Sequence, residues 1–341
     1  MSPLREVISD ASFAKPMPDP QRRTGHRIVL EDLSRFGPDS VFPCVPLEAA
    51  NRYCKSLATR HYENFSVASL LVPRRVRQDF YNVYSYCRWS DDLADEMDNR
   101  QDSLRLLNWW RAELSDCFSG DARHPVFIAL RETILRHSLS IDPFENLLDA
   151  FVQDQSVVRY ESAQNLLDYC QGSANPVGRI LLQIGNVFQA DAFALSDEIC
   201  TGLQLANFCQ DFQTDALRGR IYLPMEAWSS SGLTESAILS GKRSQNLESA
   251  LADWVVSART HLINGLPLVR STPRWLSRDI QLFARGGLTI LDNISRNHFN
   301  VWTNAINVSK SQKLRLLARA VLFPRSTHVA DLARPSGTSP V

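Results

Sequence analysis

Two short acidic runs have a spacing that would place carboxylates together on one side of a helix. The first run reads SDDLADE, and on a helix Tyr84, Arg88, Asp91 and Asp95 share a face with Asp92 beside them. Three carboxylates within about two turns repel one another in an apolar setting, and a multivalent cation would relieve that repulsion. Hard oxygen ligands favour Mg²⁺, which usually keeps water ligands and bridges to substrate phosphates.

The second run, NFCQDFQTD, repeats this arrangement later in the chain. Asn207, Asp211 and Asp215 stand four residues apart and share a helical face, and Arg218 and Arg220 follow in ALRGRIYLP. Arginine binds two phosphate oxygens at once and stays charged. The run therefore predicts a second site for Mg²⁺ and phosphate.

Acidic runs on helices are more often solvated surface than metal sites. Here both runs are embedded in apolar and aromatic helix, YNVYSYCRWSDD and LQLANFCQDF, and there are two of them. Together these features favour metal binding over a solvated face.

The elements that would position these residues are helices. Seven of the 17 prolines precede residue 47 and three follow residue 323, so residues 1–45 are predicted as an irregular arm and residues 326–341 as a flexible tail. Helical spacing continues through most of the middle, and no alternating strand pattern longer than a few residues occurs. We therefore expect one all-α domain over residues 46–325, a helical bundle in which Pro176 interrupts a helix of residues 163–190 after Asn175.

The composition excludes several classes of protein. The 341 residues carry 37 Lys and Arg against 37 Asp and Glu, which argues against a nucleic-acid-binding protein. The seven cysteines form no CxxC pair, as expected of free thiols in a reducing cytoplasm. No secretory signal, no long apolar run and no glycine-rich nucleotide motif is present.

Five motifs in order resemble those of the squalene/phytoene synthases, which are head-to-head prenyl transferases with the all-α isoprenoid synthase fold and a central cavity. They are HYENFSVASLLVP at 61–73, Tyr84-Ser85-Tyr86-Cys87-Arg88, the DxxxD run Asp91–Asp95, DYCQGSANPVG at 168–178, and Asn207-Asp211-Asp215 with the RGRIYLP run. The resemblance covers about residues 50–300.

Two departures from the family pattern point to one branch of it. Ser173-Ala174-Asn175 stands where the family has Val-Ala-Gly, and Asn64 replaces the usual Ser of the opening motif. These segments are similar to those of the hydroxysqualene synthase branch of the hopanoid pathway. The resemblance implies ionisation of presqualene diphosphate, rearrangement of the cation and capture by water. Squalene synthase, or presqualene diphosphate or phytoene synthase acting on farnesyl or geranylgeranyl diphosphate, stays the alternative.

The resemblance also implies roles for individual residues. Mg²⁺, as about two or three ions, would be held by Asp91, Asp95, Asn207, Asp211 and Asp215. The diphosphate would be bound by His61, Asn64, Arg88, Arg218 and Arg220. Phe65, Phe80, Tyr84, Tyr169 and Phe208 would surround the cation, and Asn175 or Asn64 would hold the water. Each aromatic could instead be ordinary core, Asn175 could satisfy backbone groups freed by Pro176, and His61 could simply be hydrogen-bonded at a helix end.

The expected partners follow from the same resemblance. The substrate is an isoprenoid diphosphate, handed over by a presqualene diphosphate synthase, and NADPH is not expected. The basic amphipathic segment 309–325 could lie on the inner face of the membrane as a peripheral contact of a cytoplasmic protein, or pack on the bundle. A helical assembly factor of the same fold is the non-enzyme alternative, which the retained acids disfavour.

Overall fold

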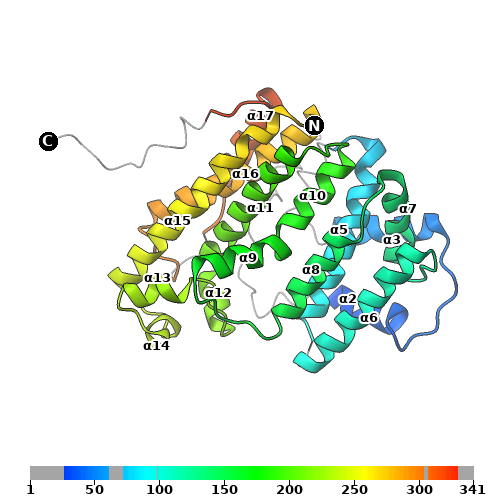
Figure 1. The fold of residues 1–341 in the computed structure, drawn as a ribbon, viewed down its shortest axis with the longest axis horizontal. Coiled ribbons are helices and arrows are strands. Elements are labelled where there is room, and N and C mark those ends of the chain that lie inside the picture. The colour runs from blue at the N-terminus through cyan, green and yellow to red at the C-terminus, as the bar shows by residue number, and fades with distance from the viewer. Residues whose placement is uncertain (1–26, 61–71, 98, 303–305, 329–341) are drawn as a thin grey trace. The chain divides into compact units, whose positions relative to one another are not determined.

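The computed structural model describes residues 27–60, 72–97, 99–302 and 306–328, and in these ranges the regular elements are helices (Figure 1). The exception in these ranges is one isolated parallel bridge between Arg159 and Ile221. The predicted all-α class is confirmed. Among the described helices, none is both long enough and apolar enough to traverse a bilayer.

Contacts between residues divide the chain into two compact units. Of the described residues, those in 27–157 and 179–186 belong to the N-terminal unit, and those in 158–178 and 187–328 belong to the C-terminal unit. Helix α10, Asn175–Ile184, has residues in both units. The bounds predicted for a single domain, 46 and 325, do not coincide with these divisions and stay a prediction.

The helices have the following bounds. Those of the N-terminal unit are α2 (Arg27–Phe36), α3 (Leu47–Arg60), α5 (Arg74–Asp95), α6 (Arg100–Ser119), α7 (Pro125–His137) and α8 (Asp142–Gln153). Those of the C-terminal unit are α9 (Ala163–Ser173), α11 (Ala190–Gln210), α12 (Phe212–Leu217), α13 (Met225–Ser230), α14 (Glu235–Leu239), α15 (Gln245–Gly265), the 3₁₀ helix η1 (Leu266–Arg270), α16 (Arg274–Arg296) and α17 (Lys310–Leu322).

Helix α2 corrects the prediction that residues 1–45 form an irregular arm. It lies between the prolines at 20 and 38, in a stretch that has none. Its Val29 and Phe36 are buried, and its Asp32 accepts a hydrogen bond of 2.7 Å from the Tyr53 hydroxyl on α3. Packing against α3 thus stabilises a helix that the surrounding prolines concealed.

Aromatic packing fixes α5 within the N-terminal unit. The rings of Trp89 on α5 and Trp110 on α6 stack with centroids 5.1 Å apart, and the His124 ring meets both edge-on. The indole of Trp89 donates to the Tyr53 hydroxyl, and that of Trp110 donates to Ser90. Burial lowers the pKa of His124 to about 3, so this imidazole is neutral and acts as part of the core.

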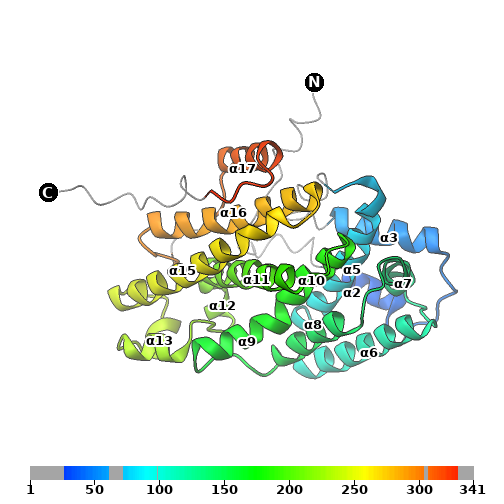
Figure 2. The same ribbon diagram turned by 45° about the horizontal axis from the view of Figure 1, so that its top comes forward.

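Small residues let α11 and α15 pack closely in the C-terminal unit (Figures 1 and 2). A Cβ at Gly202 on α11 would lie 2.8 Å from the backbone nitrogen of Leu262, and one at Gly265 would lie 2.7 Å from the carbonyl oxygen of Leu195. The C-terminal end of α15 therefore lies beside the N-terminal half of α11, and the two helices are antiparallel. Of this pair, α11 carries Asn207, the first residue of the second acidic motif, near its C-terminal end.

Two predicted helices are each divided. The expected helix 163–190 becomes α9 and α10, which separate at Ala174, one residue earlier than Pro176 suggested. The second acidic motif, expected on one helix, is divided between α11 and α12, which meet at Asp211. Proline accounts for the first break, because it cannot donate the backbone hydrogen bond that a continuous helix requires.

The predicted flexible tail of residues 326–341 is corrected at its beginning. On α16 the guanidinium of Arg285 is fully buried and donates to the carbonyl oxygen of His328 at 2.8 Å, and Gln281 donates to that of Ser326. Arg270 donates to the Thr327 hydroxyl at 2.7 Å. Residues 326–328 are therefore held against the C-terminal unit.

Asp279 on α16 is a buried acid with no hydrogen-bond partner among the described residues. Both of its carboxylate oxygens are inaccessible and accept no hydrogen bond from any described residue. Burial raises the pKa of Asp279 well above its usual range, although the charge of Arg278 acts in the opposite sense. Folding therefore favours the protonated form of this carboxyl group relative to the unfolded chain.

We expect Asp279→Asn to increase the free energy of unfolding near pH 7. In the unfolded chain Asp279 is ionised above about pH 4, so folding must take up a proton, and stability falls by about 1.4 kcal/mol per pH unit until the folded pKa is reached. The asparagine amide takes up no proton on folding, so Asp279→Asn does not lose stability in this way. Urea unfolding at pH 5 and pH 8 measures the effect, and Asp253→Asn at an exposed position of α15 is the matched control. If the free energy of unfolding changed equally with pH in both variants, the raised pKa of Asp279 would be contradicted.

Candidate active site

The first acidic motif lies at the C-terminal end of α5, on its least buried side. Between residues 81 and 95 the side chains that keep some exposure are Tyr84, Cys87, Arg88, Asp91 and Asp95, and the others are buried. These positions follow helical spacing, so the expected shared face is present. Burial raises the pKa of the Tyr84 phenol to about 12, which keeps it protonated beside the acids.

Arg88 lies between the two neighbouring acids of the motif. Its guanidinium forms an ion pair with Asp92, and a second nitrogen lies 3.6 Å from Asp91 Oδ2. Asp92 is buried, and its Oδ2 has no hydrogen-bond partner among the described residues. Burial raises the pKa of Asp92 to about 7, while the charge of Arg88 lowers it. Asp92 thus orients Arg88, a role that the sequence did not indicate.

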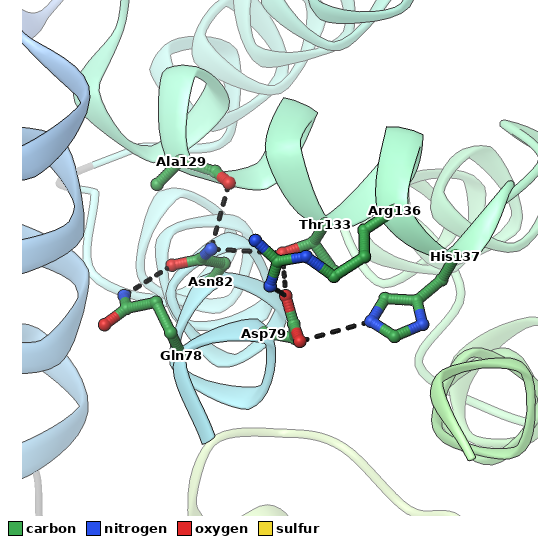
Figure 3. Close-up of polar contacts among 7 residues, drawn as sticks. All are labelled: Gln78, Asp79, Asn82, Ala129, Thr133, Arg136 and His137. Atoms are coloured by element: carbon green, nitrogen blue, oxygen red, sulfur yellow. Dashed lines mark hydrogen bonds and ion pairs between the residues drawn. The ribbon is translucent and has the colours of Figure 1, made fainter. Parts of the chain in front are cut away.

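A buried polar network attaches α5 to α7 behind this face (Figure 3). The Asp79 carboxylate accepts hydrogen bonds from the Thr133 hydroxyl at 3.1 Å and from Arg136 at 2.9 Å, and its other oxygen lies 3.1 Å from His137 Nε2. One turn along α5, Asn82 donates to the Ala129 carbonyl and to Thr133. No pattern in the sequence indicates this network.

The second motif spans the junction of α11 and α12. Backbone hydrogen bonds run from the Asp211 amide to the Asn207 carbonyl at 2.8 Å and from the Asp215 amide to the Asp211 carbonyl at 2.9 Å. The spacing of a helix is therefore kept across the break, and the three residues follow one side of it. Asn207 is exposed, and Asp211 and Asp215 are half-buried.

A tight turn brings Arg220 back toward this motif. Gly219 has φ = +77°, a left-handed conformation that favours glycine, and the Arg220 amide donates to the Asp215 carbonyl at 2.8 Å. Arg218 is exposed at the end of α12. Arg159 positions the turn, because its guanidinium donates to the Gly219 carbonyl at 2.6 Å and pairs with Glu235.

The predicted aromatic residues Tyr169 and Phe208 lie in one buried cluster of the C-terminal unit. Phe208 stacks on Tyr222 of the RGRIYLP run with centroids 3.8 Å apart, and Tyr169 lies 6.2 Å from Tyr222 and 5.3 Å from Tyr160. The resemblance predicted Tyr169 and Phe208 as site aromatics, whereas nothing in the sequence distinguished Tyr160 and Tyr222 from ordinary core residues. In the N-terminal unit, Phe80 is buried on α5.

Asn175 is buried at the start of α10. Its Oδ1 accepts a hydrogen bond of 3.1 Å from the Thr201 hydroxyl on α11. Thr201 therefore fixes the orientation of the Asn175 side-chain amide. The alternative role for Asn175, to satisfy backbone groups freed by Pro176, would not require this side-chain contact. The remaining predicted residues, His61, Asn64 and Phe65, lie outside the described residues.

The carboxylate and amide oxygens of the two acidic motifs suit a magnesium ion that is also coordinated by oxygen atoms of a substrate. In the parts of the chain that the structure describes, no three His, Cys, Asp or Glu side chains are grouped closely enough to enclose a metal. Mg²⁺ seldom uses a complete protein cage and instead combines one or two carboxylates with waters and phosphate oxygens. Asp91 and Asp95, and separately Asn207, Asp211 and Asp215, offer such oxygen ligands with arginine nearby.

Comparison with known proteins identifies the family. The squalene/phytoene synthase family model matches residues 58–317. The crystal structure of squalene synthase HpnC from Alicyclobacillus acidocaldarius is 38% identical with a TM-score of 0.72, covering 75% of this chain and 97% of that one. A dehydrosqualene synthase structure has the same fold at 23% identity, with a TM-score of 0.74 and 81% and 97% of the two chains covered. The phytoene synthase of Arthrospira platensis is 28% identical over 303 residues, 83% of this chain and 97% of that protein. The chain therefore belongs to the squalene/phytoene synthase family, whose members are enzymes that process isoprenoid diphosphates.

Proposed function

We propose that this enzyme is a hydroxysqualene synthase. It takes presqualene diphosphate, the carbon–oxygen bond to the diphosphate breaks, and the carbocation rearranges. Water then adds to the cation, and the proton it loses passes to the departing diphosphate or to solvent. The products are hydroxysqualene and diphosphate, and no reductant is consumed.

Charge neutralisation supports this proposal. Bond cleavage leaves negative charge on the diphosphate, and cationic groups placed where that charge develops lower the barrier. Mg²⁺ bound by Asp91, Asp95, Asn207, Asp211 and Asp215 would supply part of the positive charge. Arg88, Arg218 and Arg220, with His61 and Asn64 by family resemblance, would supply the contacts to phosphate oxygens.

The aromatic side chains fit the second requirement of the reaction. Ring faces stabilise a cation by about 0.5–2 kcal/mol each and offer no nucleophile that would capture it early. Tyr169 and Phe208 in the C-terminal unit, and Tyr84 and Phe80 on α5, are the aromatics that we assign to this role. Phe65 joins them by family resemblance.

The observation that carries the choice of product is the buried amide of Asn175. The related enzymes have the apolar sequence Val-Ala-Gly in this segment, whereas here a buried carboxamide is held by Thr201. A polar group at this point can hold one water, and a held water reacts at one position only. We assign Asn175 as the water-binding residue, with Asn64 as the second candidate.

Two other products are supported by specific relatives. The structure at 38% identity is named a squalene synthase, and squalene would require reduction of the same cation. Phytoene synthases match at lower identity, and phytoene would require a different diphosphate substrate. Our proposal requires neither NADPH nor a prenyl diphosphate other than presqualene diphosphate, which a separate synthase must supply.

The test is to identify the product made from presqualene diphosphate with Mg²⁺ in ¹⁸O-labelled water. We expect a labelled alcohol whose yield is unchanged by NADPH. Asn175→Gly, which restores the family residue, should lower the share of alcohol among the products. Asn246→Gly, at an exposed position in the first turn of α15, is the control variant.

Each contrary result is distinct. A hydrocarbon formed only with NADPH would establish a squalene synthase, and turnover of farnesyl or geranylgeranyl diphosphate alone would establish a condensing enzyme. An alcohol made equally well by Asn175→Gly would retain the activity but refute the assignment of Asn175.

A further inference from the structure

Helix α17 of the C-terminal unit lies beside α16 (Figure 2), and among the described residues its other side is exposed and carries both apolar and cationic side chains. Its inner side packs on α16 through the buried residues Leu316 and Ala320. The opposite side carries the exposed apolar residues Leu314 (47% exposed), Val321 (36%) and Leu322 (67%), and Phe323 (60%) follows directly after the helix. We name this side, with the exposed cations Lys310, Arg315 and Arg325, the α17 outer face.

The apolar residues of the α17 outer face form one stripe. Lys310, Leu314, Ala318 and Leu322 stand four residues apart, and Val321 lies next to them on the same side. Most other exposed large apolar residues of the described chain are scattered singly, such as Val256 on α15 and Leu135 on α7. A continuous stripe marks a surface that meets another apolar phase.

The charge around this stripe has a single sign. Residues 306–328 contain Lys310, Lys313, Arg315, Arg319 and Arg325 and no acidic residue, in a chain whose overall formal charge is zero. The exposed cations Lys310, Arg315 and Arg325 flank the apolar stripe along the helix and just beyond it. Long basic side chains can keep their charges among lipid headgroups while apolar neighbours enter the acyl boundary.

We propose that the α17 outer face docks on an anionic lipid bilayer as a peripheral membrane contact. An apolar stripe with one-signed basic flanks is complementary to a surface that is apolar inside and negative outside. This contact goes beyond the proposed reaction and does not depend on its product. It would bring the enzyme to the phase in which an isoprenoid diphosphate resides.

The test is flotation of the full chain with vesicles of phosphatidylcholine containing phosphatidylglycerol, compared with vesicles of phosphatidylcholine alone. We expect binding to the anionic vesicles that weakens at high salt. Arg315→Glu with Arg325→Glu should weaken it on the order of tenfold or more, since each basic residue near the surface contributes about fivefold. Leu322→Ser with Phe323→Ser should also reduce binding.

Matched controls separate docking from general charge and from misfolding. Arg52→Glu with Lys55→Glu changes two exposed cations of α3, and Val256→Ser changes an exposed apolar residue of α15. Both should bind vesicles as the unchanged protein does, and circular dichroism should show equal helicity throughout. Equal binding by the controls and the α17 variants would overturn the proposal.

The α17 outer face could instead contact a second copy of the chain, and the same variants decide between the two. Sedimentation without lipid should show one unchanged species for the protein and for Leu322→Ser with Phe323→Ser. A dimer that dissociates in this variant, together with no flotation, would overturn the proposal. Because flotation requires no turnover, its failure is distinct from failure of the hydroxysqualene assignment.

Discussion

Asp211→Asn is expected to lower turnover by about a hundredfold to a thousandfold while the helices remain intact. Asp211 is half-buried at the junction of α11 and α12, between Asn207 and Asp215 along one side. The substitution keeps the shape of the side chain but removes its charge, and an amide is a weaker ligand for Mg²⁺ than a carboxylate. Loss of one electrostatic contact to developing charge costs about a hundredfold to a thousandfold in other enzymes.

The measurement combines turnover with metal binding. Calorimetric titration of Mg²⁺ in the presence of inorganic diphosphate should show weaker binding by Asp211→Asn, and a raised Mg²⁺ concentration should recover part of the activity. Asp191→Asn, in the exposed first turn of the same helix, is the control that should change neither quantity. Unaltered turnover and metal binding in Asp211→Asn would exclude Asp211 as a ligand. Asp91→Asn should behave in the same way for the first motif.

Asp79→Ala is expected to destabilise the N-terminal unit by about 3 kcal/mol. The carboxylate is buried and accepts from Thr133, Arg136 and His137 on α7. Its removal leaves the Thr133 hydroxyl and the mostly buried His137 ring short of a partner, and breaking a buried charged network on one side costs about 3–5 kcal/mol. Arg136 can turn to solvent, which places the effect at the lower end of that range.

Urea unfolding measures this prediction through a lower midpoint at an unchanged slope. Asp149→Ala removes the acid of the more exposed Arg111–Asp149 ion pair and should cost less than about 1 kcal/mol. Asp79→Asn, which keeps the volume, should fall between the two variants. A cost for Asp79→Ala no larger than that for Asp149→Ala would show that the network does not hold α5 against α7.

The all-α class and the exposed face of α5 could be predicted from the sequence because both depend on periodicity. Helical intervals separate Tyr84, Arg88, Asp91 and Asp95, and in a regular helix residues at these intervals must lie on the same face. The breaks at Ala174 and Asp211 could be placed only approximately, because tertiary packing decides where a helix ends near a proline or a polar residue.

The supporting residues were not predictable, because their partners are distant in the sequence. Asp79 sits in the run RRVRQDF and resembles an ordinary surface acid, and only the packing of α7 shows that it is buried. Arg159 lies 60 residues before the turn that it holds. Helix α2 was concealed by neighbouring prolines, since its stability comes from contact with α3 and not from local preference.

The fixation of residues 326–328 has a consequence for synthesis of the chain. Arg285 is made more than 40 residues before its acceptors at Ser326 and His328, so during translation its guanidinium cannot yet be buried with these partners. A buried charge without partners is unfavourable, so α16 can reach its final packing only after residues 326–328 have been made and have left the ribosome. A chain that stops before residue 326 would therefore have an unfinished C-terminal unit.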